Sequence, residues 1–288
     1  MNGGKLRRLL GWTSGPGQGL LTLLILVAFL ALYAGVLLGL LRQWMDDDNY
    51  THGLLVPVIA AFLAFRHLDR LPRRGEPSVA AALPFLVPGL LLYAVGTVAA
   101  ELFALRLSLL FVFWGLVRGL YGVRAFRLLR FPLFFLIFMI PLPYVFFYRV
   151  AFPLQLLSAT ASAKALTFLG VAHVQTGNII HLRETSLDVV TACSGLRSLI
   201  ALVAVGTLAA GLFPMPRGLR VLLVALAVPI AMLTNALRIV LTAVLVHLAG
   251  SDFLGGALHQ ATGFLTFGIG VGLLFLLGGG FRWHRQSA

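Results

Sequence analysis

The sequence predicts an all-α membrane protein, a polytopic helical bundle of about eight transmembrane helices with both termini in the cytoplasm. Three observations lead to this prediction. Hydrophobic residues make up 60% of the 288 residues and charged residues only 11%, whereas soluble domains carry about 25% charged residues. The apolar runs are long enough to cross a bilayer. They also lack the period of two that a membrane β-barrel requires.

Eight apolar runs give the order of the predicted helices. The first follows a short basic tail and is too long for a signal peptide, so we expect an uncleaved helix. The second is short and contains Pro57, which leaves open whether it crosses the membrane completely. We expect one transmembrane domain over residues 1–288, with spans at 20–41, 50–65, 79–99, 107–122, 131–148, 194–213, 221–240 and 258–277.

The segment 150–192 differs from the rest because polar residues recur along it. We expect it to form an extracytoplasmic loop. Within it, residues 174–190 alternate between polar and apolar side chains, which predicts a small hairpin or an extended stretch. The segment leads directly into Cys193, the only cysteine, so we expect it to cover any site built around that residue.

The distribution of charge predicts the orientation. On the eight-span arrangement, 15 of the 22 Lys and Arg residues fall on the side of the two termini, together with two acidic residues, and the other side receives seven of each sign. The basic side is expected to be cytoplasmic by the positive-inside rule. This rule explains the net charge of +13, so we expect no nucleic-acid partner.

The same topology brings three chemically competent residues to the outer face. Cys193 lies at the outer start of the sixth span, Arg238 near the outer end of the seventh and His259 at the outer start of the eighth. A helix N-terminus favours a thiolate, a histidine can exchange the proton and an arginine can stabilise an oxyanion. Each residue alone has an ordinary explanation, since a lone cysteine usually packs and a terminal arginine usually reaches the headgroups.

The residues around these positions resemble the exosortase/archaeosortase family of membrane-embedded cysteine enzymes. The resemblance rests on three blocks and on an earlier match, Tyr50-Thr51-His52-Gly53, where the family has Tyr-Ser-His-Gly. The three blocks are Ala192-Cys193-Ser194-Gly195-Leu196-Arg197-Ser198-Leu199, Asn235-Ala236-Leu237-Arg238-Ile239, and His259 with Gly263.

The resemblance implies a protease or transpeptidase of the inner membrane with its site on the periplasmic face. Its partners would be exported proteins with a C-terminal sorting tail: a Pro-Glu-Pro-like motif, a transmembrane helix and a basic cluster. It implies Cys193 as the nucleophile, Arg238 as the stabiliser of the transition state and His259 as the acid/base partner. We further expect Arg197, His52 and Asn235 to contribute to substrate binding, and neither a metal nor a cofactor.

Two other functions are compatible with a polytopic bundle. A transporter would use prolines within its spans to break helices. Acidic residues at membrane depth, which ion-coupled carriers usually need, are scarce here, and Glu101 is the only candidate. A non-catalytic scaffold for exopolysaccharide assembly would tolerate the loss of Cys193. A metalloprotease is disfavoured because His-Glu-x-x-His is missing from the sequence. A serine protease is disfavoured because neither Ser194 nor Ser198 lies in a Gly-x-Ser-x-Gly pattern.

Overall fold

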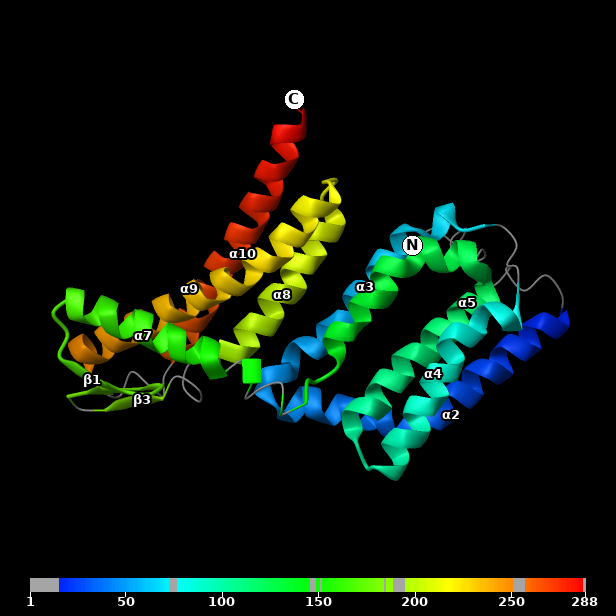
Figure 1. The fold of residues 1–288 in the computed structure, drawn as a ribbon, viewed down its shortest axis with the longest axis horizontal. Helices are drawn as coiled ribbons and strands as arrows, with labels where there is room; N and C mark the ends of the chain where they lie inside the picture. The colour runs from blue at the N-terminus through cyan, green and yellow to red at the C-terminus, as the bar shows by residue number, and fades with distance from the viewer. Residues whose placement is uncertain are drawn as a thin grey trace. The chain divides into compact units, whose positions relative to one another are not determined.

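The computed structural model shows a helical protein with a small β-sheet (Figure 1). It describes residues 16–72, 77–143, 145, 149–150, 152–183, 185–188, 195–250 and 257–286. The chain packs as two compact units, Met1–Pro141 and Leu142–Ala288. The expected single transmembrane domain over residues 1–288 stays a prediction.

Among its described residues, the first unit contains four α-helices and three short 3₁₀ helices. In chain order they are α2 (Pro16–Asp46), η1 (Asp48–Leu54), α3 (Leu55–Arg66), η2 (Leu68–Arg70), α4 (Val79–Val98), α5 (Leu102–Phe135) and η3 (Leu136–Met139). The second unit contains α7 (Phe152–Phe168), β1 (His173–Thr176), β2 (Ile179–Leu182), β3 (Ser186–Asp188), α8 (Gly195–Leu212), α9 (Arg217–Ala249) and α10 (Ala257–Gln286).

The helices confirm an all-α membrane bundle. Among the described residues, five helices are long and apolar enough to cross a membrane: Gly19–Asp46, Val79–Val98, Leu102–Met139, Arg217–Leu248 and Gln260–Gly280. α8 contributes a shorter apolar stretch, Arg197–Leu212. α3 has 12 residues, about 18 Å at 1.5 Å per residue, which is less than a bilayer core of about 30 Å. The number eight and the cytoplasmic termini stay predictions.

The helix α5 reverses direction at Gly122. Gly122 has a φ of 83°, a conformation that glycine adopts without a steric penalty. The Trp114 Nε1–H donates to the Leu133 carbonyl at 3.0 Å, although residues 19 apart in a straight helix would lie about 28 Å apart. α5 is therefore a helical hairpin, and its second arm covers residues 123–135, earlier in the chain than the span that we expected at 131–148.

Glycines allow α4 and the first arm of α5 to pack closely. A Cβ on Gly89 would lie 2.8 Å from Val112 Cγ2 and 3.0 Å from the Val112 backbone nitrogen. A Cβ on Gly96 would lie 2.9 Å from the backbone nitrogen of Leu105. As the residue number rises along one helix it falls along the other, so the two helices are antiparallel. Small residues permit this close backbone approach between helices in membranes.

We predict that Gly89→Ala destabilises the first unit by about 1–3 kcal/mol, because overpacking a tight core has costs of this size. The neighbouring backbone nitrogen cannot move away as the end of a flexible side chain could. Gly35→Ala on α2 is the matched control, since a Cβ there would meet nothing within 4 Å. Thermal unfolding in detergent measures both variants, and equal midpoints for the two would contradict the prediction.

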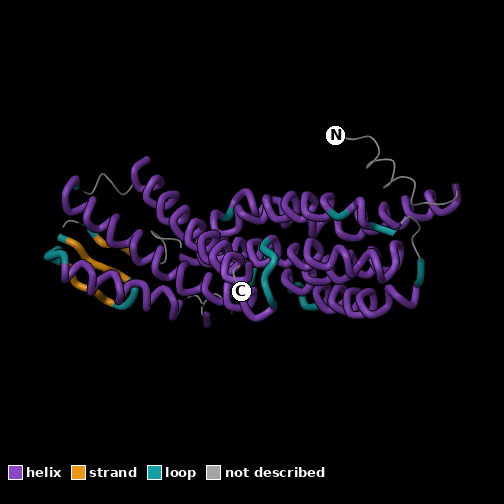
Figure 2. The backbone as a smooth tube through the Cα atoms, turned by 90° about the horizontal axis from the view of Figure 1, so that it is seen from above, coloured by secondary structure: helices purple, strands orange, loops and turns teal. Residues whose placement is uncertain are grey.

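The segment 150–192 is more regular than the loop that we predicted. The predicted hairpin is confirmed as β1 and β2, which pair antiparallel, and β3 adds a third antiparallel strand. The helix α7 was not predicted at all. Its Ser158 and Ser162 hydroxyls lie 3.4 Å and 3.2 Å from the carbonyls of Met232 and Ala236, so α7 runs parallel to α9 and packs along it (Figure 1). Figure 2 shows the strands, in orange, beside helices.

The sheet packs against the helices through one apolar cluster. Ile180 and Leu187 from the sheet are fully buried with Ile239 and Ala243 from α9. In sequence Ile239 directly follows Arg238, so the sheet supports the part of α9 that carries this arginine.

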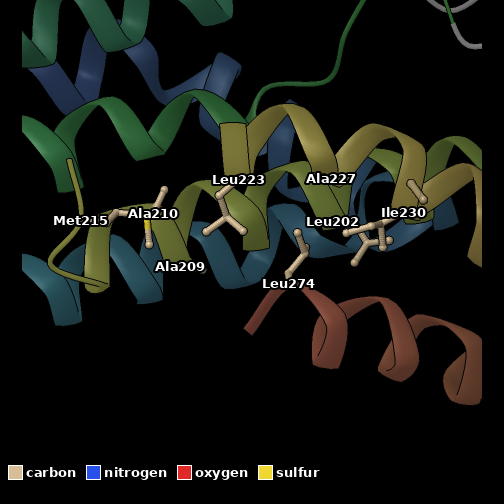
Figure 3. Close-up of a cluster of buried hydrophobic side chains, with 9 residues drawn as sticks. Leu202, Ala209, Ala210, Met215, Leu223, Ala227, Ile230 and Leu274 are labelled. Carbon is tan, nitrogen blue, oxygen red and sulfur yellow. The ribbon is translucent and has the colours of Figure 1, made fainter. Parts of the chain in front are cut away.

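The helices α8, α9 and α10 share a second apolar cluster (Figure 3). Leu202 comes from α8, Leu223 from α9 and Leu274 from α10, and all three are fully buried. This cluster occupies the part of the three-helix bundle near the N-terminal half of α9. The packing of these three helices also determines which residues of α8 and α10 lie at the level of Arg238 on α9.

Candidate functional site

The structure describes the predicted site residues to different extents. Cys193 lies outside the described residues, and α8 begins at Gly195, two positions after it. Arg238 and Asn235 lie on α9. His259 lies in the first turn of α10, where only its backbone is described.

The contacts between α8 and α10 show that these helices run parallel. A Cβ on Gly270 would lie 3.0 Å from Leu202 Cδ1, and a Cβ on Gly206 would lie 3.8 Å from Leu274 Cδ1. Both pairs are offset by 68 positions in the sequence. With this constant offset, the start of α8 at Gly195 falls at the level of Gly263 on α10.

The contacts of α9 place Arg238 at the same level. A Cβ on Gly263 would lie 3.1 Å from the Cζ and 3.1 Å from the Nη2 of Arg238. Further along the same interface, a Cβ on Gly270 would lie 3.4 Å from Thr234 Cγ2. α9 and α10 are therefore antiparallel, and the Arg238 guanidinium contacts α10 at Gly263.

A third contact, between α8 and α9, gives the same alignment. A Cβ on Gly206 would lie 3.2 Å from Ala227 Cβ. Gly195 precedes Gly206 by 11 residues and Arg238 follows Ala227 by 11 residues, about 16 Å along each helix at 1.5 Å per residue. The three pairwise contacts agree that the start of α8, Arg238 and Gly263 lie at one level of the bundle.

The position of His259 on α10 follows from helix geometry. His259 precedes Gly263 by four residues, and residues four apart lie on the same face of a helix, one turn from each other. The face of α10 that receives Arg238 therefore carries His259 one turn closer to the N-terminus of the helix.

A comparison with known families decides the classification. Residues 44–276 match the transmembrane exosortase family. The chain belongs to this family. No match was found among curated proteins or among solved structures. The match starts near the end of α2 and ends within α10, so it includes most of each compact unit.

The level of Arg238 in this exosortase is also polar beyond the arginine itself. Asn235 and Thr242 flank Arg238 on α9 and are 5% and 0% exposed. Neither the Asn235 Oδ1 nor the Thr242 Oγ1 has a hydrogen-bond partner among the described residues. Thr262 and Thr266 on α10 are also buried. The bundle therefore changes from the apolar cluster of Figure 3 to a polar layer at the level where α8 begins.

This polar layer is chemically suited to a developing negative charge. Arg238 is half-buried, and an arginine side chain keeps its positive charge in a protein. Charges in such a desolvated place act more strongly than in water. The sequence did not predict that Asn235 and Thr242 lie in the same buried layer. Thr242 was missed entirely, because a threonine in an apolar helix is unremarkable in sequence.

Arg197 lies in the first turn of α8 and is half-buried. The offset of 68 between α8 and α10 puts it at the level of residue 265, one half-turn deeper than Gly263. An arginine here adds positive charge near the helix N-terminus, which already favours anions. Its expected role in substrate binding stays a prediction.

His52 belongs to the first unit, so its packing is described there alone. It lies in η1, which begins where the Asp47 side chain accepts from the Asn49 backbone N–H at 2.9 Å. Its half-buried ring is tilted by 43° against the ring of Tyr50, and the two ring centroids lie 6.3 Å apart. Gly53 packs directly on the indole of Trp44, where a Cβ would overlap the ring. This packing gives the His52 segment a defined shape, and its part in the site stays a prediction.

In the part of the chain that the structure describes, no three His, Cys, Asp or Glu side chains gather closely enough to hold a metal ion. The polar groups at the level of Arg238 are amide, hydroxyl and guanidinium groups. Of these, the guanidinium is a cation that suits an oxyanion or a carboxylate.

Proposed function

We propose that this exosortase is a membrane-embedded cysteine protease or transpeptidase that cleaves the C-terminal sorting signals of exported proteins. The observation that best supports the proposal is the shared level of three helix positions. The start of α8 lies two residues after Cys193, Arg238 is on the facing side of α9, and Gly263 is one turn from His259 on α10. This shared level supports the proposal because each of the three stretches carries or adjoins a residue type that acyl transfer by a thiol uses.

In the first step, the Cys193 thiolate attacks the carbonyl carbon of the scissile peptide bond. The carbonyl electron pair moves to oxygen, and Arg238 stabilises the resulting oxyanion. As the intermediate collapses, the carbon–nitrogen bond breaks and the imidazolium of His259 gives its proton to the leaving amine. The products are a thioester on Cys193 and a cut tail that stays in the membrane.

In the second step, water or an amine acceptor attacks the thioester. His259 now accepts a proton from the attacking group, and the carbon–sulfur bond breaks. The Cys193 thiolate and the imidazolium are regenerated, so the cycle closes without an oxidant or a cofactor. With water the reaction is a hydrolysis, and with an amine it is a transpeptidation.

The proposed substrate is an exported protein with a C-terminal sorting tail, as the resemblance to the family implies. The tail would combine a Pro-Glu-Pro-like motif, a transmembrane helix and a basic cluster. We propose that Arg197 binds the acidic residue of that motif. Asn235 and His52 would contact the substrate backbone. The site would face the periplasmic side of the inner membrane, where an exported substrate arrives after its translocation.

Alkylation tests this proposal directly, because Cys193 is the only cysteine. Membranes that contain the protein are incubated with a tagged reporter that ends in a sorting tail. We expect N-ethylmaleimide to stop the cleavage and untreated membranes to accumulate a reporter adduct that neutral hydroxylamine removes, as it does thioesters. Cleavage that continues after complete alkylation would refute the proposal.

We predict that a membrane-impermeant maleimide added outside spheroplasts labels Cys193. The positive-inside rule puts this residue on the face opposite the basic loops, and a thiolate reacts faster than a thiol. Labelling is followed by the mass shift of the intact protein, with permeabilised spheroplasts as the control for full reaction. If labelling requires permeabilisation, the proposed orientation is wrong.

A further inference from the structure

The contact between Arg238 and Gly263 has a specific geometry. The position of a Cβ on Gly263 would be 3.1 Å from Cζ, 3.1 Å from Nη2 and 3.4 Å from Nε of Arg238. Three bonded atoms at nearly the same distance mean that the flat face of the guanidinium lies over the glycine. An edge-on approach would put one nitrogen closer than Cζ by about a bond length.

Gly263 differs in this respect from the other described glycines of α10. At Gly270 a Cβ would meet the Leu202 side chain at 3.0 Å, and at Gly278 it would meet Phe213 at 2.8 Å, so these two glycines serve apolar packing. At Gly268 and Gly272 a Cβ would meet nothing within 4 Å. Among these positions Gly263 alone faces a charged group.

We propose that Gly263 is a positioning residue for Arg238. Because Gly263 has no side chain, the guanidinium can lie directly on the backbone of α10, a position that we call the seat. The seat holds the guanidinium at the level of the α8 N-terminus, one turn from His259. The inference rests on the proposed function, because Arg238 is given a role in the reaction there. Gly263 itself touches neither substrate nor reacting atoms, and it acts through the position of the guanidinium.

A methyl group on Gly263 would displace the guanidinium with little effect on the fold. Carbon and its non-bonded neighbours prefer separations of about 3.5–4.0 Å, so atoms at 3.1 Å must move away by about 0.5 Å. The atoms concerned are the end of a flexible side chain, which can turn without moving the helices. A displacement of this size matters for catalysis, since misplacing a group by about 1 Å can lower a rate about 100-fold.

The experiment compares alanine variants along α10 in the full-length protein. We expect Gly263→Ala to lower the turnover of the tail-bearing reporter about tenfold, with an unchanged midpoint of thermal unfolding. Gly268→Ala and Gly272→Ala are the matched controls and should stay within about twofold of the unaltered protein, since they lie in open space. Full turnover in Gly263→Ala would overturn the inference.

A double-mutant cycle separates positioning from general packing. In an Arg238→Lys background the planar group is missing. Adding Gly263→Ala should then lower turnover by less than about threefold relative to Arg238→Lys alone. The same tenfold loss in both backgrounds would overturn the inference. If Gly263→Ala fails to accumulate, the variant is combined with Arg238→Ala: recovery of folded protein would support the seat, and continued failure would overturn it.

The outcomes also distinguish this inference from the proposed function. If alkylation of Cys193 leaves cleavage intact, the proposed function fails whatever Gly263→Ala does. If alkylation stops cleavage and Arg238→Lys lowers turnover while Gly263→Ala does not, only the role of Gly263 fails.

Discussion

Replacing Cys193 with alanine is expected to lower cleavage of a tail-bearing reporter by at least about 10³-fold, because loss of a nucleophile removes the covalent route and leaves only binding and electrostatic effects. No other cysteine can take over, since the chain has only this one. The reporter is co-expressed with the variant, and the ratio of cut to uncut tag is measured on gels. The amount of Cys193→Ala protein in the membrane should equal that of the unaltered protein.

Thr97→Ala is a suitable control for the loss of a polar side chain. Thr97 is exposed and donates only to the Tyr93 carbonyl one turn earlier, at 2.8 Å, so its replacement should leave cleavage unchanged. Efficient processing by Cys193→Ala would instead favour the non-catalytic scaffold.

Cys193→Ser should be nearly as inactive as Cys193→Ala. A free cysteine titrates near pH 8.5, and positive surroundings at a helix N-terminus lower this value further. A serine hydroxyl has no comparable access to its anion, and a single histidine must then remove the proton during the attack. Substantial activity in the serine variant would indicate that His259, or another base, is better oriented than a simple thiolate mechanism requires.

Hydropathy predicted the helices of the first unit well where an apolar run has clear ends. The predicted span 79–99 corresponds to α4, Val79–Val98, whose start is capped by the Ser78 hydroxyl accepting from the Ala81 backbone N–H at 3.2 Å. The second arm of α5 begins earlier than the predicted span at 131. Arg124, Arg127 and Arg130 interrupt the hydropathy, but arginine is a good helix former, so the helix continues through them.

Residues 152–168 were missed as a helix because their polarity is used in tertiary contacts. Ser158 and Ser162 face α9, and Gln155, one turn before Ser158 on α7, is 3% exposed. A sequence pattern cannot distinguish a serine that faces a neighbouring helix from one that faces water. The hairpin was predictable because alternation over 174–190 needs no knowledge of the partner.

The topology predicted which residues share a membrane face, but it could not predict which residues share a level. That alignment depends on which glycine of α10 faces which side chain of α9. The resemblance distinguished Gly263 from Gly270 but did not give its neighbour, and only the packing shows that Gly263 receives Arg238 while Gly270 receives Leu202. The approach of the guanidinium to α10 is therefore a finding of the structure.

Arg238→Ala is expected to lower turnover by about 10²–10³-fold, equivalent to about 2.7–4 kcal/mol, the effect of removing one donor from an oxyanion hole. The reason is that the guanidinium stabilises charge that exists only in the transition state, so kcat and kcat/KM should fall together. Arg238→Lys keeps the charge but loses the planar pair of donors, and it should retain more activity than the alanine variant.

Arg220→Lys provides the matched control on the same helix, because Arg220 is exposed near the start of α9 and distant in sequence from Arg238. It should leave both kinetic constants unchanged. Steady-state cleavage of a purified reporter in detergent measures all three variants. A rise in KM with an unaltered kcat in Arg238→Ala would mean that this arginine binds the substrate equally well in the ground state and the transition state. The oxyanion would then need another donor, and the buried polar groups at that level include those of Asn235 and Thr242.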